Sequence, residues 1–222
     1  MTFEPTHRQW AESWYGDFAA PDGSLGGYVQ LTLWPELGRS WFWSALVGPH
    51  RRPVVLVETD APLPRPSTLE LRAPGLWTEF IEQIPDEHFT VDLEAFAVAL
   101  DDPEDLFDRG WGERVPYGLE LEWEAADGLL DVVHGLVLVG DESYELEGMG
   151  RRFHWEGLPA WWDREWSNGP IDGVVIANAP LPVDHPGTAQ RSRLERSLVS
   201  TPDGPAWTEQ SRLQGPNGGD NL

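Results

Sequence analysis

The chain has 222 residues, of which 40% are hydrophobic and 11% aromatic, and these proportions exclude a wholly disordered protein. Its 38 acidic residues and 15 arginines give a net charge of −23, which repels phosphate backbones and anionic headgroups, so we expect neither nucleic acid nor a membrane as a partner. Because the sequence contains neither lysine nor cysteine, a Schiff-base lysine, a thiol nucleophile, a disulfide and a thiolate metal site are excluded.

Most of the chain alternates between apolar and polar residues, which is the pattern of strands with one buried face. Turn residues such as Pro21-Asp22-Gly23 and Gly140-Asp141 separate neighbouring segments, as in antiparallel hairpins. These signals, with 23 glycines and 20 prolines, predict an all-β protein whose antiparallel strands close into a barrel or a sandwich. In chain order, the predicted strands are residues 12–19, 26–34, 39–47, 53–59, 68–72, 88–100, 117–125, 129–139 and 142–147.

One short helix is predicted at 102–107, because Asp102 can cap it and Pro103 suits its first position. The same acidic stretch does not have the glycine and glutamate spacing of an EF-hand loop. From residue 186 onward the sequence turns polar. We expect residues 186–222 to be a polar, partly flexible tail, with residues 191–199 as a candidate helix.

The sequence begins Met-Thr-Phe-Glu-Pro-Thr-His, without a basic segment followed by an apolar one. Its apolar runs are also far shorter than the roughly 18 residues that a membrane-spanning helix needs. We therefore predict a cytoplasmic location.

Thirteen tryptophans are several times the ordinary usage and indicate either a large aromatic core or an aromatic pocket. Trp41 and Trp43 are two residues apart on one predicted strand, so they share a face with Ala45, while Phe42 and Leu46 share the other. If the tryptophan face points into a barrel, it forms a flat apolar wall for a ligand.

Histidines give little support for a metal site, because no His-x-His or His-Glu-x-x-His spacing occurs. His134 lies on an apolar strand, where it is either a core histidine or a pocket acid or base. Gly148-Met149-Gly150 lacks the third glycine of a dinucleotide fingerprint, and no P-loop is present. We therefore expect no nucleotide or other cofactor, and the histidine spacing leads us to expect no metal.

Two stretches, Glu12–Phe18 with the following Pro21–Val29, and Val115–Glu124, resemble uncharacterised actinobacterial relatives of the carotenoid 1,2-hydratase (hydroxyneurosporene synthase) family. The resemblance covers roughly residues 10–165. It implies a lipocalin-like β fold, two such domains in tandem, and relatives that hydrate polyenes or cyclise polyketide or terpenoid intermediates.

The junction between the two domains of that family resembles Gly148–Trp162, where most glycine, arginine, histidine and tryptophan positions match. Phe153 stands where the family has an aspartate, and Pro159-Ala160 replaces Arg-Asp, so both aspartates of the motif are missing. The resemblance divides the chain into a lipocalin-like domain at 1–150, a Trp-rich junction with a remnant of a second β domain at 151–185, and the tail at 186–222.

Taken together, the residues and the resemblance predict a protein that binds an apolar small molecule such as a polyene, terpenoid or polyketide intermediate. Hydration or cyclisation of that molecule is one alternative, with His154 as the acid and Arg152 orienting it. A carrier without turnover is the second alternative, and a sugar-binding or glycoside-hydrolysing protein is the third. These residues are also compatible with a homodimer. The candidate ligand-binding residues are Trp14, Tyr28, Trp41, Trp43, Trp77, Trp123, His134, Trp161 and Trp162.

Overall fold

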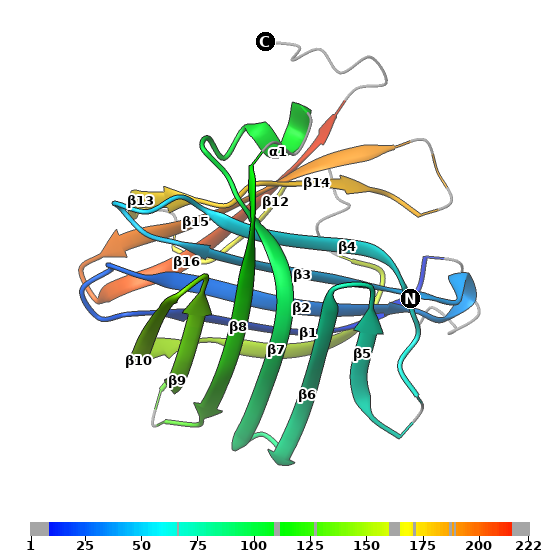
Figure 1. Ribbon diagram of the computed structural model, residues 1–222, viewed down its shortest axis with the longest axis horizontal. Coiled ribbons are helices and arrows are strands. Elements are labelled where there is room, and N and C mark those ends of the chain that lie inside the picture. The colour runs from blue at the N-terminus through cyan, green and yellow to red at the C-terminus, as the bar shows by residue number, and fades with distance from the viewer. Residues whose placement is uncertain are drawn as a thin grey trace.

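The computed structural model describes residues 9–65, 67–108, 112–126, 128–159, 165–170, 172–186, 188 and 190–214. The described chain forms two antiparallel sheets and little helix, which confirms the all-β prediction (Figure 1). The strands of the first sheet are β1 (Ala11–Ala19), β2 (Gly26–Trp34), β3 (Arg39–Val47), β4 (Val54–Pro62), β5 (Leu69–Ala73), β6 (Leu76–Ile84), β7 (His88–Ala99), β8 (Glu113–Glu124), β9 (Asp131–Val139), β10 (Glu142–Gly150) and β11 (Arg152–Gly157).

The first sheet curls into a ring. Its strands follow the order β4-β3-β2-β1-β10-β9-β8-β7-β6-β5, with β11 on the edge of β1. Val54 and Val55 of β4 pair with Ala99 and Val98 of β7, and this short contact closes the ring. In Figure 1, β1–β4 cross behind β6–β9, so that the two halves of the sheet face each other. The fold is therefore barrel-like, as the sequence predicts.

The second sheet lies against the outside of β1–β3. It consists of β12 (Glu165–Asn168), β13 (Val174–Asn178), β14 (Leu181–Asp184), β15 (Arg191–Thr201) and β16 (Gly204–Gln214). The long β15–β16 hairpin forms its centre, with β12 beside β16 and with β13 and β14 both beside β15. This arrangement confirms a second β segment and extends it well beyond the predicted boundary at 185.

The prediction of a polar tail from residue 186 is wrong for residues 191–214, and so is the candidate helix at 191–199. Leu194 and Leu198 alternate with polar residues on β15, and both are buried together with Trp207 of β16. Because these side chains pack against the first sheet, the hairpin is part of the folded core. Residues 215–222 lie outside the described part of the chain.

The other elements follow the sequence closely. The predicted strands at 26–34 and 39–47 match β2 and β3 residue for residue, and 129–139 lies between two neighbours, as expected for a strand with apolar residues on both faces. The short helix α1 (Asp105–Asp108) follows a turn in which Asp102 accepts a hydrogen bond from the amide of Glu104 at 2.9 Å. Strands β6 and β11 were not predicted.

Two apolar clusters fill the molecule. The first lies inside the ring and is built mainly from aliphatic side chains and phenylalanines, with Trp123 among them. The second lies between the two sheets and contains Trp34, Trp41, Trp43 and Trp207. Phe42 and Leu46 point into the ring, so the shared face of Trp41 and Trp43 points outward. The expectation of an indole-lined ring interior is therefore wrong for Trp41 and Trp43, because a second sheet covers their face.

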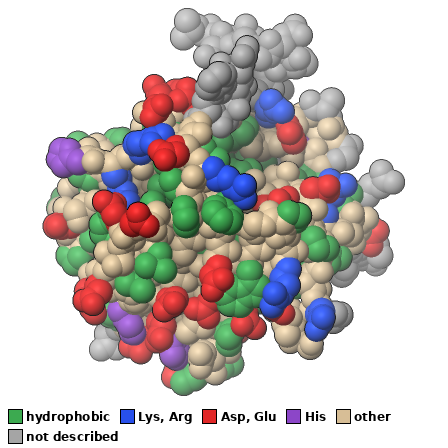
Figure 2. Space-filling view, in the orientation of Figure 1, with side chains coloured by type: hydrophobic (Ala, Val, Ile, Leu, Met, Phe, Trp, Pro, Cys, Tyr) green, Lys and Arg blue, Asp and Glu red, His purple; other side chains and the backbone are tan. Residues whose placement is uncertain are grey.

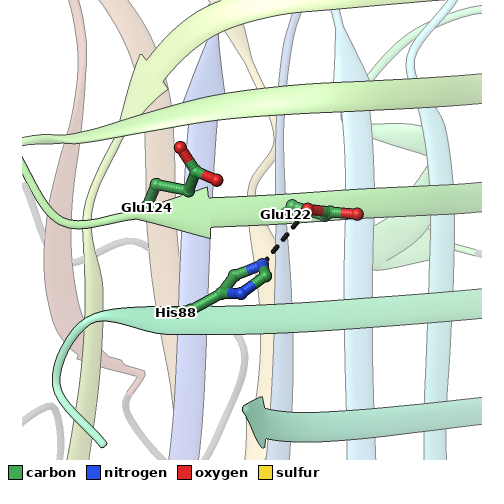
Figure 3. A group of neighbouring side chains, drawn as sticks. All are labelled: His88, Glu122 and Glu124. Atoms are coloured by element: carbon green, nitrogen blue, oxygen red, sulfur yellow. Dashed lines mark hydrogen bonds and ion pairs between the residues drawn. The ribbon is translucent and has the colours of Figure 1, made fainter. Parts of the chain in front are cut away.

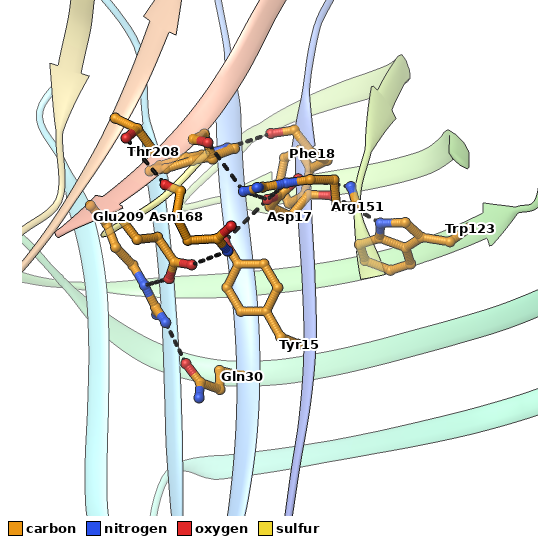
Figure 4. Close-up of polar contacts among 11 residues, drawn as sticks. Tyr15, Asp17, Phe18, Gln30, Trp123, Arg151, Asn168, Thr208 and Glu209 are labelled. Atoms are coloured by element: carbon orange, nitrogen blue, oxygen red, sulfur yellow. Dashed lines mark hydrogen bonds and ion pairs between the residues drawn. The ribbon is translucent and has the colours of Figure 1, made fainter. Parts of the chain in front are cut away.

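Two arginines, each paired with a carboxylate, join the two sheets through further hydrogen bonds (Figure 4). Arg151 donates two hydrogen bonds to the carboxylate of Asp17, at 2.9 and 2.6 Å, and a third to the backbone oxygen of Trp207 at 3.1 Å. Arg196 of β15 donates to Glu209 of β16 at 2.6 Å and also to the side-chain oxygen of Gln30 on β2. The side chains of Arg196 and Glu209 are 2% and 1% exposed. These contacts fix the hairpin on the ring.

Burial alone would lower the pKa of Arg196, but Glu209, Tyr28 and Tyr15 together outweigh burial and raise that pKa above its ordinary value. The guanidinium also lies 4.3 Å from the ring centre of Tyr28 and 5.1 Å from that of Tyr15, within the range of cation–π attraction. Arg196 therefore stays charged inside the protein.

In the part of the chain that the structure describes, no helix has the length and apolar character needed to cross a bilayer.

Candidate functional site

A cavity of about 830 Å³ lies at the end of the ring where the β6–β7 and β8–β9 connections meet β1 and β11. We call it the mouth cavity. Leu129, on the β8–β9 connection, is 99% exposed at its rim. The lining residues are Trp14, Tyr15, Ser67, Thr68, Leu69, Glu79, Phe80, Ile81, Glu82, Asp86, Phe89, Leu129, Asp131, Arg152, Phe153 and His154.

Strand pairing brings three of the predicted site residues into this cavity. Trp14 of β1 pairs with His154 of β11, and Gly16 pairs with Arg152 two residues along. Paired residues of antiparallel strands project to the same side, so Trp14, His154 and Arg152 all face the ring interior. The rings of Trp14 and His154 stack at 4.7 Å with an angle of 10° between their planes.

His154 and Arg152, two of the polar residues that line the cavity, are both held by carboxylates. His154 Nε2 lies 3.0 Å from Glu12 Oε1, and because a carboxylate only accepts, Nε2 donates this bond. Nδ1 is then the atom at which the imidazole can gain or lose a proton. Arg152 donates to Asp131 at 2.9 Å and to the backbone oxygen of Asp86 at 2.5 Å. The site thus offers a positioned imidazole and a guanidinium whose charge is largely balanced.

The apolar wall of the cavity comes from strands on the opposite side of the ring. Phe80 of β6 and Phe89 of β7 pack edge to face, with ring centres 5.8 Å apart. Trp123 lies behind Phe89, again at 5.8 Å, and its indole nitrogen donates to the backbone oxygen of Asp17 at 2.9 Å. A Cβ atom on Gly16 would lie 2.9 Å from the Trp123 ring, so this close packing requires glycine. Trp123 therefore supports the wall without lining the cavity.

Other predicted ligand-binding residues lie elsewhere. Tyr28 is fully buried between the two sheets. Trp41 and Trp43 line a second cavity of about 560 Å³, beside Val183 and His185 near the second sheet. These three aromatic residues face away from the mouth cavity because they project from the outer face of β2 and β3.

Trp77 and His134 lie on the outer face of the ring. Trp77 donates a 3.0 Å hydrogen bond to Glu70, and His134 lies 3.5 Å from Glu122. The prediction of a pocket or core position for His134 is wrong, because its strand exposes one face. Trp161 and Trp162 fall outside the described residues.

Burial between the sheets raises the pKa of Tyr28 to about 12, although the neighbouring Arg196 favours the ionised form. The native state therefore keeps a proton that the unfolded chain releases near pH 10, and stability is lost as the pH rises from about 10 to about 12. We expect the free energy of unfolding of the wild type to fall by about 2–3 kcal/mol relative to that of Tyr28→Phe across this window. Urea unfolding at several pH values measures the difference between the two proteins, and a difference independent of pH would contradict the burial of this hydroxyl.

Sequence reasoning missed the residues that complete the mouth cavity. Phe80, Phe89, Asp131 and Glu12 all come from segments far from the junction motif. The alternation of residues 89–93 was the available signal for Phe89, since it places this residue on an inward face. The partners of His154 and Arg152 depend on strand register, which the sequence does not reveal.

Comparison with known proteins gives one family. No curated protein matches the sequence significantly. A family model described as a domain of unknown function, DUF7064, matches residues 2–188, which include the whole ring and the mouth cavity. The chain therefore belongs to the DUF7064 family.

Proposed function

We propose that the protein binds an apolar small molecule, such as a polyene, terpenoid or polyketide intermediate, in the mouth cavity. The observation that carries the proposal is the meeting of an apolar wall, Phe80 and Phe89, with the positioned polar pair of His154 and Arg152. Ligand sites in proteins are concave, largely apolar and about 300–1,000 Å³ in volume, with a few polar groups that orient the ligand. The volume of about 830 Å³ lies within this range, and the lining combines the apolar wall with polar residues, among them Glu79, Glu82 and Asp86.

The arrangement suggests how a ligand lies. Its apolar body packs against the phenylalanines and Leu69, and a polar end reaches His154 and Arg152 on the facing strands. Since both polar residues are fixed by carboxylates, they are pre-organised and lose little conformational freedom on binding. We also propose that binding takes place in the cytoplasm.

A specific contact favours a second candidate function, which is hydration or cyclisation of the bound molecule. A protonated His154 can deliver its Nδ1 proton to a carbon–carbon double bond, and Glu12 stabilises the imidazolium. Water then adds to the cation and loses a proton, which restores the imidazolium. The indole of Trp14 can stabilise a nearby carbocation by about 0.5–2 kcal/mol.

Binding is tested with retinol, a fluorescent polyene, titrated into the full chain. We expect Trp14→Ala to weaken binding about tenfold or more, because losing one aromatic ring that lines the cavity costs at least about 1.4 kcal/mol. Trp77→Ala is the matched control, since this indole lies on the outer face of the ring. Its affinity should stay within about twofold of the wild type. Equal losses in the two variants, or no binding to the wild type, would contradict the proposal.

Turnover is tested separately by mass spectrometry of the ligand after incubation. A gain of one water indicates hydration, a changed retention time at constant mass indicates cyclisation, and an unchanged ligand indicates a carrier. If His154 is the acid, His154→Gln should abolish the change while retinol still binds.

A further inference from the structure

Four titratable side chains gather on the outer face of the ring, on the side of the sheet opposite the mouth cavity. His88 of β7 pairs with Glu124 of β8, and Glu122 of β8 pairs with His134 of β9. The residues between them, Phe89 and Trp123, point inward into the apolar cluster. Strand alternation therefore projects the two histidines and two glutamates outward on three adjacent strands.

The distances within this group suit metal ligands (Figure 3). His88 Nε2 lies 3.1 Å from Glu122 Oε2, and the ligand atoms of His88, Glu122 and Glu124 all lie within 4.8 Å of one another. Ligands that hold Zn²⁺ at about 2.0–2.2 Å in a tetrahedron are about 3.3 Å apart, so the first pair already has the required spacing. Glu124 is exposed and can approach by a change of rotamer.

His134 holds Glu122 from the neighbouring strand. Its Nε2 lies 3.5 Å from the same oxygen, Glu122 Oε2, that His88 contacts. The side chains of His88 and His134 are 25% and 34% exposed, so both are partly fixed by packing on the sheet. Side chains that position a ligand in this way typically change metal affinity about 10–100-fold.

The surrounding surface attracts cations. Asp92 lies on the same face, where burial and, to a lesser extent, the repulsion of Glu120 and Glu122 raise its pKa. Glu147 of β10 pairs with His134 and adds a further carboxylate beside the group. In Figure 2, histidines lie among acidic side chains on the lower part of this face. Such a field raises the local concentration of divalent ions.

We propose that this face binds a divalent transition-metal ion, with His88, Glu122 and Glu124 as ligands and His134 orienting Glu122. An imidazole among the ligands selects for zinc and similar ions over magnesium and calcium, which prefer oxygen ligands alone. The ion joins the ends of β7 and β8, next to the β6–β7 turn that contributes Asp86 to the mouth cavity. The site does not depend on the proposed small-molecule function.

The test is a titration of the chelator-treated full chain with zinc sulfate, followed by calorimetry, with magnesium chloride in a parallel experiment. We expect one saturable site for Zn²⁺ and at least tenfold weaker binding of Mg²⁺. Glu122→Gln and His88→Gln should each lower the Zn²⁺ affinity about tenfold or more. Melting temperatures measured without metal show that both variants are folded.

Glu145→Gln provides the matched control. Glu145 is exposed on the outer face of β10, and its substitution removes the same charge without removing a proposed ligand. Its Zn²⁺ affinity should remain within about twofold of the wild type. An equal loss in Glu145→Gln and Glu122→Gln would show diffuse attraction of cations and overturn the site, as would the absence of saturable Zn²⁺ binding.

Discussion

Ending the chain after Pro186 is expected to lower the melting temperature by at least about 15 °C or to abolish cooperative unfolding. The cut removes β15 and β16 and therefore exposes the outer face of β2 and β3, where Tyr28, Trp41 and Trp43 are buried. Aromatic side chains bury about 150–250 Å² each, and each lost kcal/mol lowers the melting temperature of a chain of this size by about 2–4 °C. Differential scanning calorimetry measures the effect.

This expectation matters because the family model ends at residue 188, whereas the folded core continues to β16. A cut after Gln214 is the control, since it keeps every described strand, and its melting temperature should stay within about 2 °C of the full chain. If the chain ending at Pro186 had the same melting temperature as the full-length protein, the hairpin would contribute nothing to stability. The packing of Trp207 against the first sheet would then be wrong.

Alternation predicted most strands of the ring but not which face is the inner one. On β3 both faces are apolar, with Trp41 and Trp43 on one and Phe42 and Leu46 on the other. Period-two patterning fixes which residues share a face, but only the position of the covering layer decides where that face points. Here the second sheet covers the tryptophans, and its strands were the least visible in the sequence.

The hairpin was missed because its buried positions include charged residues. On β15, Ser192, Leu194, Arg196 and Leu198 are all buried on one face. Ser192 contacts His185, which follows β14, and Arg196 pairs with Glu209 of β16. An arginine at a position of this alternation makes the segment look like a solvent-exposed helix or tail. Only its partner Glu209, thirteen residues later, shows that the position is buried. Strand β6 was missed for a related reason, since the inward Thr78 and the outward Trp77 obscure its alternation.

The candidate site was only partly predictable. Arg152 and His154 were chosen because they match the junction motif of the resembling family, and the structure places both in the mouth cavity with Trp14. Their carboxylate partners are distant in sequence: Glu12 lies 142 residues from His154. The pair of Glu12 and His154 arises from the register of β1 with β11, which depends on the whole sheet.

Replacing Glu209 by alanine is expected to destabilise the protein by about 3–5 kcal/mol, because it leaves the charge of Arg196 buried without its carboxylate partner. Asn168 also loses the acceptor of its 3.3 Å hydrogen bond. Urea unfolding followed by far-ultraviolet circular dichroism measures the change. Glu195→Ala is the matched control on the same hairpin: Glu195 pairs with Arg193 at a more exposed position, where an ion pair contributes about 1 kcal/mol or less.

The double variant Arg196→Met with Glu209→Leu separates the cost of losing the ion pair from the cost of leaving Arg196 buried without its partner. Because replacing a buried ion pair by apolar side chains of similar size is often neutral, the double variant should be more stable than Glu209→Ala. It still loses the bond from Arg196 to Gln30, so full recovery is not expected. If Glu209→Ala cost no more than Glu195→Ala, water would reach Arg196, and the hairpin would not be sealed against the ring.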